Sequence, residues 1–386
     1  MKNWESVKLG DLYEVHNGLS KGGKFFGSGY PFLTFSTVFN NYFLPEELTD
    51  FVQSTEKERE SYSILRGDVF VTRTSETSDE LGMSCVALKD YPNATYNGFT
   101  KRMRPITHRV LPEYIGYYMR MPVFRGEFQA FSTMTTRASL KNEDLLSLEV
   151  KLPEIGEQKK IAGILSAYDA LILNNQKQIK LLEEAAQRLY KEWFVNLRFP
   201  GHENTEILDG IPAGWRIEEV GKLIGKVPRT TQIMTANYHK SGKIPIIDQS
   251  KTFIAGYTDD ETALVDLGEP VIVFGDHTRI LKYIQFPFAK GADGTQLIVS
   301  ANKNMPQSLL YCGLVNIDLS NYHYARHFKY LKAESLLVPI IDIAKQFDEY
   351  AGDLFKRIQV LRDEISSATE ARDRLLPKLV SGEIEL

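Results

Sequence analysis

The sequence predicts an α+β protein in which two mixed α/β domains are joined by two long helices that pair as an antiparallel coiled coil. Three observations lead to this fold class. Two stretches carry an apolar heptad pattern, a constant offset separates the two patterns, and the segment that opens the first domain recurs after the first heptad stretch. Sustained heptads are typical of helices that bury a narrow seam against another helix. The chain therefore reads as domain, helix, domain, helix, an internal repeat with pseudo-twofold symmetry.

In both heptad stretches, seam residues alternate in steps of four and three, while Gln, Lys, Glu and Arg fill many of the other positions. The first seam is Ile161, Leu165, Tyr168, Ile172, Asn175, Ile179, Leu182, Ala186, Leu189 and Trp193, and the second is Phe347, Ala351, Leu354, Ile358, Leu361, Ile365, Ala368, Arg372, Leu375 and Leu379. Each position of the second seam lies 186 residues after its counterpart, which indicates one element used twice. Two unrelated surface helices are the alternative, and they would not share this offset.

The two predicted helices are each other's natural partners, because so narrow a seam leaves no wide face for a globular core. Each seam carries one polar residue, Asn175 or Arg372, and a lone polar residue at such a position fixes the register of a pair. In an antiparallel, centred pair Arg372 falls beside Tyr168. Pro377 is expected to end the second helix near Leu376, because proline has no backbone N–H to donate.

The domain boundaries follow from these helices and from Pro and Gly. We place the first domain at residues 1–153, the first helix at 154–197, the second domain at 198–340 and the second helix at 341–386. Within each domain the sequence predicts short strands separated by turns, with a Gly-initiated buried strand near the middle of each.

The two domains begin and end alike. A Trp precedes a Gly by six residues at the start of each, as Trp4 precedes Gly10 and Trp215 precedes Gly221. Each domain closes with an apolar run before a proline, and the two prolines again lie 186 residues apart. The middles show no such match, so we expect a duplication whose ends and helices are kept and whose middles have diverged.

Length and composition place the protein in a broad class. With 386 residues and 25% charged residues it should form two or three domains with their own cores. The amino terminus lacks the apolar run of a signal peptide, and no segment has membrane-spanning length. Cys85 and Cys312 lack metal-ligand spacing, so they read as reduced core residues of a cytoplasmic protein that does not bind membranes.

Basic residues are gathered although the formal net charge is −4. No Asp or Glu occurs between Glu14 and Glu46, between Asp90 and Glu113, between Glu219 and Asp248, or between Asp318 and Glu334. Basic and short hydrogen-bonding side chains in and near such stretches can supply phosphate anchors and base contacts in double-stranded DNA. In the first domain these candidates are Lys21, Lys24, Arg73, Thr74, Ser75, Lys101, Arg102, Thr135, Thr136 and Arg137. In the second domain they are Arg229, Thr230, Lys240, Lys243, His277, Thr278, Arg279, Lys290, Gln296, Arg326 and Lys329.

No cluster of residues predicts catalysis, a metal site or a cofactor on this chain. The run Gly18–Lys24 imitates a phosphate-binding loop, but Phe25 follows the lysine, and Pro31 with nearby glycines forbids the helix that such a loop needs. Nor is there the Asn-Pro-Pro-aromatic run of amino-methyltransferases. We expect a non-catalytic protein.

The two predicted helices also set the distance between the domains. If the helices pair antiparallel, the domains lie at opposite ends of a rod about 50 Å long, an arrangement suited to binding two unlike DNA half-sites.

Four motifs spread over the whole chain carry a family resemblance. They are Gly156–Ala162 with Leu165 and Asp169, then Lys191–Phe194, then Ile211–Trp215, and Leu375–Leu386 with the sequence LLPKLVSGEIEL, which is the most specific. Together they resemble the specificity subunits of Type I restriction–modification systems. The resemblance implies two target-recognition domains, each reading one half of a split, asymmetric DNA sequence, joined by two conserved helices.

The resemblance also implies partners. The helices would dock methylation subunits, expected to be two, which bind S-adenosylmethionine, and the complex would take up ATP- and Mg-dependent motor-nuclease restriction subunits. Two other functions stay open on the residues alone. One is a self-contained DNA methyltransferase or nuclease, and the other is a coiled-coil adaptor that binds only protein.

Overall fold

A computed structural model describes most of the chain. The described residues are 4–75, 81–130, 138–322 and 326–386. The chain divides into two compact units: unit 1 combines Met1–Leu173 with Ser366–Leu386, and unit 2 is Asn174–Ile365. Each unit holds one mixed domain together with part of each long helix. In the described residues, no helix is both long and apolar enough to cross a membrane.

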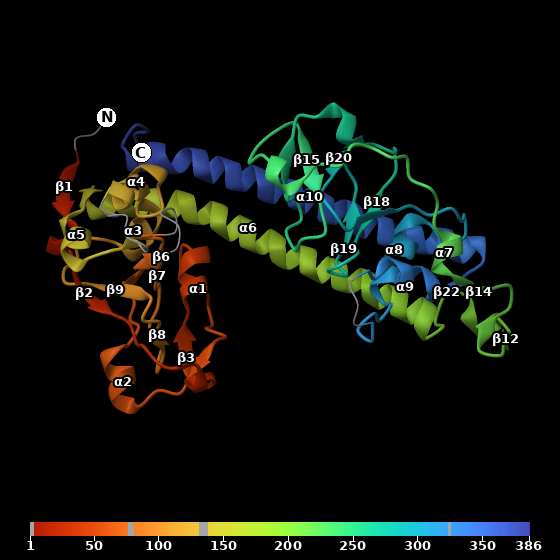
Figure 1. Ribbon diagram of the computed structural model, residues 1–386, viewed down its shortest axis with the longest axis horizontal. Helices are drawn as coiled ribbons and strands as arrows, with labels where there is room; N and C mark the ends of the chain where they lie inside the picture. The colour runs from red at the N-terminus through yellow and green to blue at the C-terminus, as the bar shows by residue number, and fades with distance from the viewer. Residues whose placement is uncertain (1–3, 76–80, 131–137, 323–325) are drawn as a thin grey trace. The chain divides into compact units, whose positions relative to one another are not determined.

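The two long helices are α6, Ile155–Tyr190, and α10, Ile341–Val380 (Figure 1). In unit 1, Arg372 Nη1 lies 2.6 Å from Asp169 Oδ1. In unit 2, Asn175 Nδ2 donates to Glu364 Oε2 at 2.8 Å. Further along α6 in the same unit, Glu183 lies 3.0 Å from Arg362 of α10, so within unit 2 the partner's number falls as the number along α6 rises, and the helices are antiparallel. All predicted seam residues are buried or half-buried. The partner of Arg372 is one residue from the predicted Tyr168.

The predicted end of the second helix was wrong. α10 runs through Pro377 and ends at Val380. The proline removes one backbone hydrogen bond, but Leu376 and Leu379 around it are buried in the core of unit 1 against Ile161. Burying two leucines contributes about 3–6 kcal/mol, which offsets the about 3 kcal/mol that a proline costs inside a helix.

The mixed domain of unit 1 is built on an antiparallel sheet in the order β2-β9-β5-β7. These strands are Tyr13–Asn17, Thr100–Pro105, Val69–Thr72 and Ser84–Val86. A second sheet, β4-β3-β8, consists of Phe51–Val52, Phe26–Leu33 and Thr95–Tyr96, and β6, Thr74–Ser75, pairs with β10, Ala138–Ser139. The helices are α1 Phe35–Asn40, α2 Glu56–Ser61, α3 Pro112–Tyr118, α4 Pro122–Ala130 and α5 Asn142–Ser147. Every residue of β5 is buried, so the larger sheet is covered on both faces.

The mixed domain of unit 2 has a different middle. One sheet has the order β16-β15-β20-β17, with Gly256–Thr258, Ile244–Ile247, Phe288–Lys290 and Leu264–Val265. The other is β19-β18-β21, with Leu281–Ile284, Val271–Gly275 and Thr295–Ile298. The helices are α7 Val220–Leu223, α8 Gln307–Val315 and α9 Phe328–Ala333, and the short hairpin β12-β13, Ile207–Leu208 with Ile211–Pro212, precedes β14, Arg216–Glu219.

The ends of the two domains form the same frame, as predicted. β1, Glu5–Lys8, pairs antiparallel with β11, Glu149–Leu152, and β14, Arg216–Glu219, pairs in the same way with β22, Ser335–Val338. The repeated glycine serves one purpose in both. A Cβ on Gly10 would lie 3.2 Å from the carbonyl oxygen of Leu146, and one on Gly221 would lie 3.1 Å from that of Lys332. Leu146 and Lys332 are 186 residues apart, so the contact itself is duplicated.

Two motifs of the family resemblance meet in unit 1. Lys160 Nζ, near the start of α6, donates to the backbone oxygen of Leu386 at 3.1 Å. Gln158 is fully buried and holds the start of α6: its amide donates to the carbonyls of Pro153 and Arg109 and accepts from the N–H of Leu111, each at 2.8 Å. These two motifs therefore hold the start of α6 and the end of the chain together where helix and domain meet.

The two cysteines are buried and free, as predicted for core residues. Burial raises the pKa of the Cys85 thiol to about 12 and also raises that of Cys312. Neither is a reactive thiolate at neutral pH, because the thiolate and not the thiol is the nucleophile.

Candidate nucleic-acid interface

A tight turn in unit 2 presents three of the predicted contact residues together. It connects β18 to β19, and His277, Thr278 and Arg279 are exposed on it. The backbone N–H of Arg279 donates to the carbonyl of Gly275 at 2.7 Å, and the N–H of Gly275 donates to the carbonyl of Ile280 at 2.8 Å. An imidazole, a hydroxyl and a guanidinium can all hydrogen-bond to phosphates and base edges. The turn therefore offers varied polar groups on a fixed backbone.

The start of α9 lies beside this turn. The backbone N–H of Phe328 donates to Asp276 Oδ1 at 2.7 Å, and the N–H of His327 donates to the Asp276 carbonyl at 2.9 Å. Asp276 is buried, and its carboxylate accepts the backbone hydrogen bond that holds the start of α9. The predicted residues Arg326 and Lys329 flank these two donors, and both are exposed. Two further cations are thereby placed next to the turn.

A hollow of about 340 Å³ in the same domain gathers four more predicted residues. Arg229, Thr230, Lys290 and Gln296 line it, together with Gln232. Burial lowers the pKa of the Lys290 ammonium, because the charged form loses hydration there. Across the described part of the chain, no carboxylate forms an ion pair with Arg229 or Lys290. A phosphate would supply the missing negative charge and accept several hydrogen bonds.

The hollow and the turn adjoin each other on one sheet. Gln296 pairs with Phe274 across β18 and β21, directly before the turn begins. The backbone N–H of Asp276 in the turn donates to the carbonyl of Gly294 at 2.7 Å, just before β21. We call this set of side chains the unit 2 interface: Arg229, Thr230, His277, Thr278, Arg279, Lys290, Gln296, Arg326 and Lys329.

Two predicted residues of the second domain lie apart from it. Lys240 and Lys243 are exposed, but no described contact joins them to the turn or to the hollow. Lys243 Nζ lies 4.0 Å from Glu261, and its backbone N–H donates to Asp259 Oδ1 at 2.9 Å. The sequence placed both lysines in a carboxylate-free stretch, yet the fold brings carboxylates back beside Lys243.

In unit 1 the predicted residues Lys21 and Lys24 lie on one loop. Lys21 Nζ lies 2.8 Å from Glu58 and 2.6 Å from the carbonyl oxygen of Gln53, so it is bound within the domain. The hydrogen bond from Lys21 is the main reason why the pKa of Glu58 is lowered. Lys24 is exposed, with its ammonium 5.1 Å from the Phe25 ring centre, and stays available for a ligand.

The structure corrects the prediction for Lys101 and Arg102. Both lie on β9, an inner strand of the larger sheet, and their exposed fractions are 5% and 3%. Lys101 Nζ donates to Asn142 Oδ1, and burial lowers the pKa of its ammonium. Arg102 Nη1 donates to the carbonyl oxygen of Ser63 at 2.7 Å. A side chain so enclosed cannot reach a duplex while the sheet is intact, so neither belongs to an interface.

The other predicted residues of the first domain are placed only in part. Arg73 is half-buried, with Nη1 3.4 Å from Asn17 Oδ1. Thr74 and Ser75 form β6, whose backbone pairs with β10. Thr135, Thr136 and Arg137 lie outside the described residues.

Sequence reasoning missed Phe99, which is 58% exposed. It lies on a loop held against the Leu19 loop, because the N–H of Leu19 donates to the Tyr96 carbonyl at 2.8 Å and the N–H of Gly98 donates to the Leu19 carbonyl at 2.9 Å. An exposed aromatic ring on a fixed loop can stack on a base or a sugar. The sequence did contain a signal for an exposed ring here, because Phe99 directly follows an Asn-Gly turn in a stretch without Asp or Glu.

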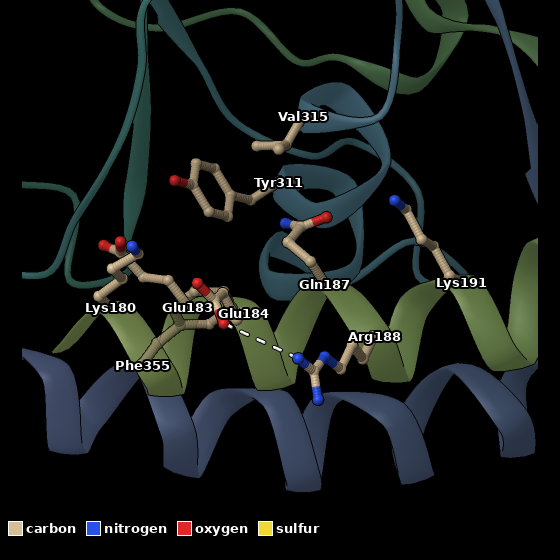
Figure 2. Close-up of a pocket in the computed structure, with 9 residues that line it drawn as sticks. All are labelled: Lys180, Glu183, Glu184, Gln187, Arg188, Lys191, Tyr311, Val315 and Phe355. Carbon is tan, nitrogen blue, oxygen red and sulfur yellow. Dashed lines mark ion pairs between the residues drawn. The ribbon is translucent and has the colours of Figure 1, made fainter. Parts of the chain in front are cut away.

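A groove on the helix surface of unit 2 has a different character. Its volume is about 480 Å³, and Figure 2 shows side chains of α6 and α8 around it. It is lined by Lys180, Glu183, Glu184, Gln187, Arg188, Lys191, Tyr311, Val315 and Phe355. Glu184 and Arg188 are 3.9 Å apart, and Glu183 lies 3.0 Å from Arg362. Mixed charges and apolar rings make this a poor site for a polyanion.

The chain is similar to known proteins. Residues 1–184 match the family model described as the Type I restriction modification DNA specificity domain. The Type I restriction enzyme MjaIX specificity subunit of Methanocaldococcus jannaschii is 26% identical over 418 residues, which cover 100% of this chain and 94% of that protein. The putative MjaX specificity subunit of the same organism is 24% identical with the same coverage.

The fold has a solved counterpart. The S subunit of a Type-I restriction-modification system from M. genitalium superimposes with a TM-score of 0.57, covering 98% of this chain and 96% of that one at 15% identity. The shared fold agrees with the repeated frame, the paired helices and the family match over the first domain and helix. The chain is therefore similar over its whole length to type I restriction–modification specificity subunits, and its residues 1–184 match their DNA specificity domain.

Proposed function

We propose that this chain is the sequence-specific DNA-recognition subunit of a type I restriction–modification complex, and that each mixed domain reads one half of a split, asymmetric target. The observation that carries the proposal is the unit 2 interface. There the fold gathers Arg229, Lys290 and Lys329, which form no ion pair among the described residues, together with a rigid turn of hydrogen-bonding side chains. Cations anchor phosphates, and the turn's side chains can discriminate base edges.

The divergent middles support an asymmetric target. The frame strands and the helices are repeated, but the sheets between them differ in strand order and pairing. Unlike surfaces place different side chains against the bases. Half-sites of different sequence are therefore expected.

The helices would serve assembly. We propose that the exposed faces of α6 and α10 hold two methylation subunits, and that the complex also takes up restriction motor-nuclease subunits. The mixed-charge groove in Figure 2 supports a protein partner over DNA. S-adenosylmethionine, ATP and Mg²⁺ would be bound by those partners, and the present chain would contribute recognition without catalysis.

A domain exchange tests the proposal. Residues 205–339 are replaced by the equivalent segment of another specificity subunit, and adenine methylation is mapped genome-wide in cells that carry the methylation subunit. We expect a split motif whose one half changes and whose other half stays. Cells that lack only this chain should lose the motif.

The same mapping separates the alternatives. If both halves of the motif changed on exchange, the domains would not be independent readers. A methylome that stays the same without this chain would contradict a recognition role and favour a protein-only adaptor. For the adaptor, Arg279→Ala and Arg326→Ala would leave DNA affinity unchanged, whereas a reader should lose it. Methyl transfer or cleavage by the isolated chain would instead establish an enzyme.

A further inference from the structure

The turn between β18 and β19 is held more firmly than a surface hairpin requires. Arg279 adopts a left-handed backbone with φ of 62°, a conformation that costs a non-glycine residue about 1 kcal/mol or more. Its Nη1 donates to the carbonyl oxygen of Leu319 at 3.0 Å. The strain persists because the surrounding contacts over-determine the turn. Such strain on exposed polar residues points to a need for a fixed geometry.

Gln249, which lies outside the turn, makes three hydrogen bonds in this region, two through its side-chain amide and one through its backbone carbonyl. Gln249 Oε1 accepts from the backbone N–H of His277 at 3.1 Å, and Gln249 Nε2 donates to the carbonyl oxygen of Asp293 at 2.7 Å. The Gln249 carbonyl also accepts from the hydroxyl of Thr278 at 2.7 Å. Gln249 thereby ties the tip of the turn to the loop before β21. No other side chain in the described residues donates or accepts a hydrogen bond at the His277 backbone.

The space around Gln249 is filled. A Cβ on Gly294, which has φ of 79°, would lie 2.8 Å from Gln249 Nε2 and 2.9 Å from Oε1. A Cβ on Gly275 would collide with the Thr278 hydroxyl and lie 2.9 Å from the Gln249 Cβ. Glycine at both positions lets the amide reach its two partners. Gln249, the two glycines and the turn therefore form one packed assembly.

We propose that Gln249 is a positioning residue for base discrimination, which fixes the turn of His277, Thr278 and Arg279 against the half-site read by unit 2. The inference rests on the proposed function and deepens it, because it names the residue on which selectivity, rather than affinity, depends. Phosphate anchoring by the hollow does not pass through Gln249. Loss of its two amide bonds leaves the cations in place but lets the turn move, so wrong bases are accepted.

The test uses the full chain assembled with its methylation subunits. Dissociation constants are measured by fluorescence anisotropy for the target duplex found by methylation mapping and for duplexes with one substituted base pair in either half. Gln249→Met has a similar length and removes both amide bonds, while Gln249→Glu keeps the acceptor for the His277 N–H. The matched control is Gln285→Met, which removes an amide bond of 2.7 Å to the Phe355 carbonyl in the same unit, away from the turn.

Gln249→Met should lower the discrimination at the half-site of unit 2 about tenfold, which corresponds to one good base contact. Discrimination at the other half-site, and affinity for unrelated DNA, should stay within about twofold. Gln249→Glu should recover part of the loss, and Gln285→Met should behave like the unchanged protein.

Three outcomes would overturn the inference. Discrimination at the unit 2 half-site could be unchanged, it could fall equally at both half-sites, or the Gln285→Met control could lose it as well. If the unchanged protein showed no discrimination at either half-site, the proposed function itself would fail. That result is distinct, because it appears before any substitution is made.

Discussion

The two mixed domains share a frame but use their basic residues differently. In unit 1 several cationic side chains interact within the domain. Lys21 pairs with Glu58, Lys101 donates a hydrogen bond to Asn142, and Arg104 pairs with the buried Asp68. In unit 2, Arg229, Lys290 and Lys329 are in no described ion pair and two of them line a hollow. A run of sequence without carboxylates looks alike in both domains. Under the proposed function, such a run forms a binding surface only where its cations are exposed and not engaged in ion pairs or hydrogen bonds within the domain.

The sharpest way to break this comparison is to remove a structural cation from unit 1. In Arg104→Met the stem remains, but Asp68, whose side chain is 0% exposed, loses its guanidinium partner. An unpaired buried carboxylate should lower the free energy of unfolding by about 3 kcal/mol. Urea denaturation followed by circular dichroism measures it.

Arg109→Met is the control for that experiment. Its partner is Glu5, and both side chains are more than half exposed, so the loss should stay below about 1 kcal/mol. Equal losses for the two variants would show that Arg104 is no more structural than a surface arginine.

A buried lysine in unit 2 tests the same idea through pH. Burial lowers the pKa of Lys282 to about 8, against about 10.4 in an unfolded chain. Between these values the unfolded state binds more protons, so stability from this group rises as pH increases. Relative to Lys282→Met, the natural protein should gain about 1–2 kcal/mol of unfolding free energy from pH 7 to pH 9.5.

Thermal or urea unfolding of both proteins at several pH values measures the difference, and subtraction removes the contribution of the tyrosines. A difference that is flat with pH would mean that Lys282 keeps an ordinary pKa.

The free cations of unit 2 should affect binding without affecting stability. Lys290→Ala is expected to weaken binding about tenfold for target and unrelated duplexes alike, and to reduce the slope of log Kd against log salt by about one. Unfolding free energy should change by less than about 0.5 kcal/mol. Lys243→Ala, outside the unit 2 interface, should leave the salt slope unchanged. Loss of stability without loss of affinity would assign Lys290 to the fold.

The smallest effect concerns what the two domains share. Gly10→Ala and Gly221→Ala each place a methyl group 3.1–3.2 Å from a backbone carbonyl that a helix holds in place. Each should cost about 1 kcal/mol, since crowding outweighs the entropy gained in the unfolded chain. Near-equal losses in calorimetry would sharpen the duplication. A clear inequality would show that the frames have diverged along with the middles.

Periodic and repeated features were determined by the sequence itself. The heptad seams, their offset of 186 and the paired register near Arg372 could be predicted because a coiled coil is encoded by local spacing. The frame glycines, Gly10 and Gly221, could be found because the same spacing of six residues from Trp to Gly occurs in both copies of the duplicated segment. The turn of His277 to Arg279 was also visible, since exposed polar residues next to a buried strand are a local signal.

Only the tertiary structure decided which cations are free. Lys101 and Arg102 look like surface residues until β9 is placed between β2 and β5, and that pairing joins strands far apart in sequence. Pro377 stays helical because the core of unit 1 buries the leucines around it. Gln249 acquires its role from backbone groups of residues 277 and 293. In each case contacts between distant segments outweigh local preference, and such contacts leave no periodic trace in a single sequence.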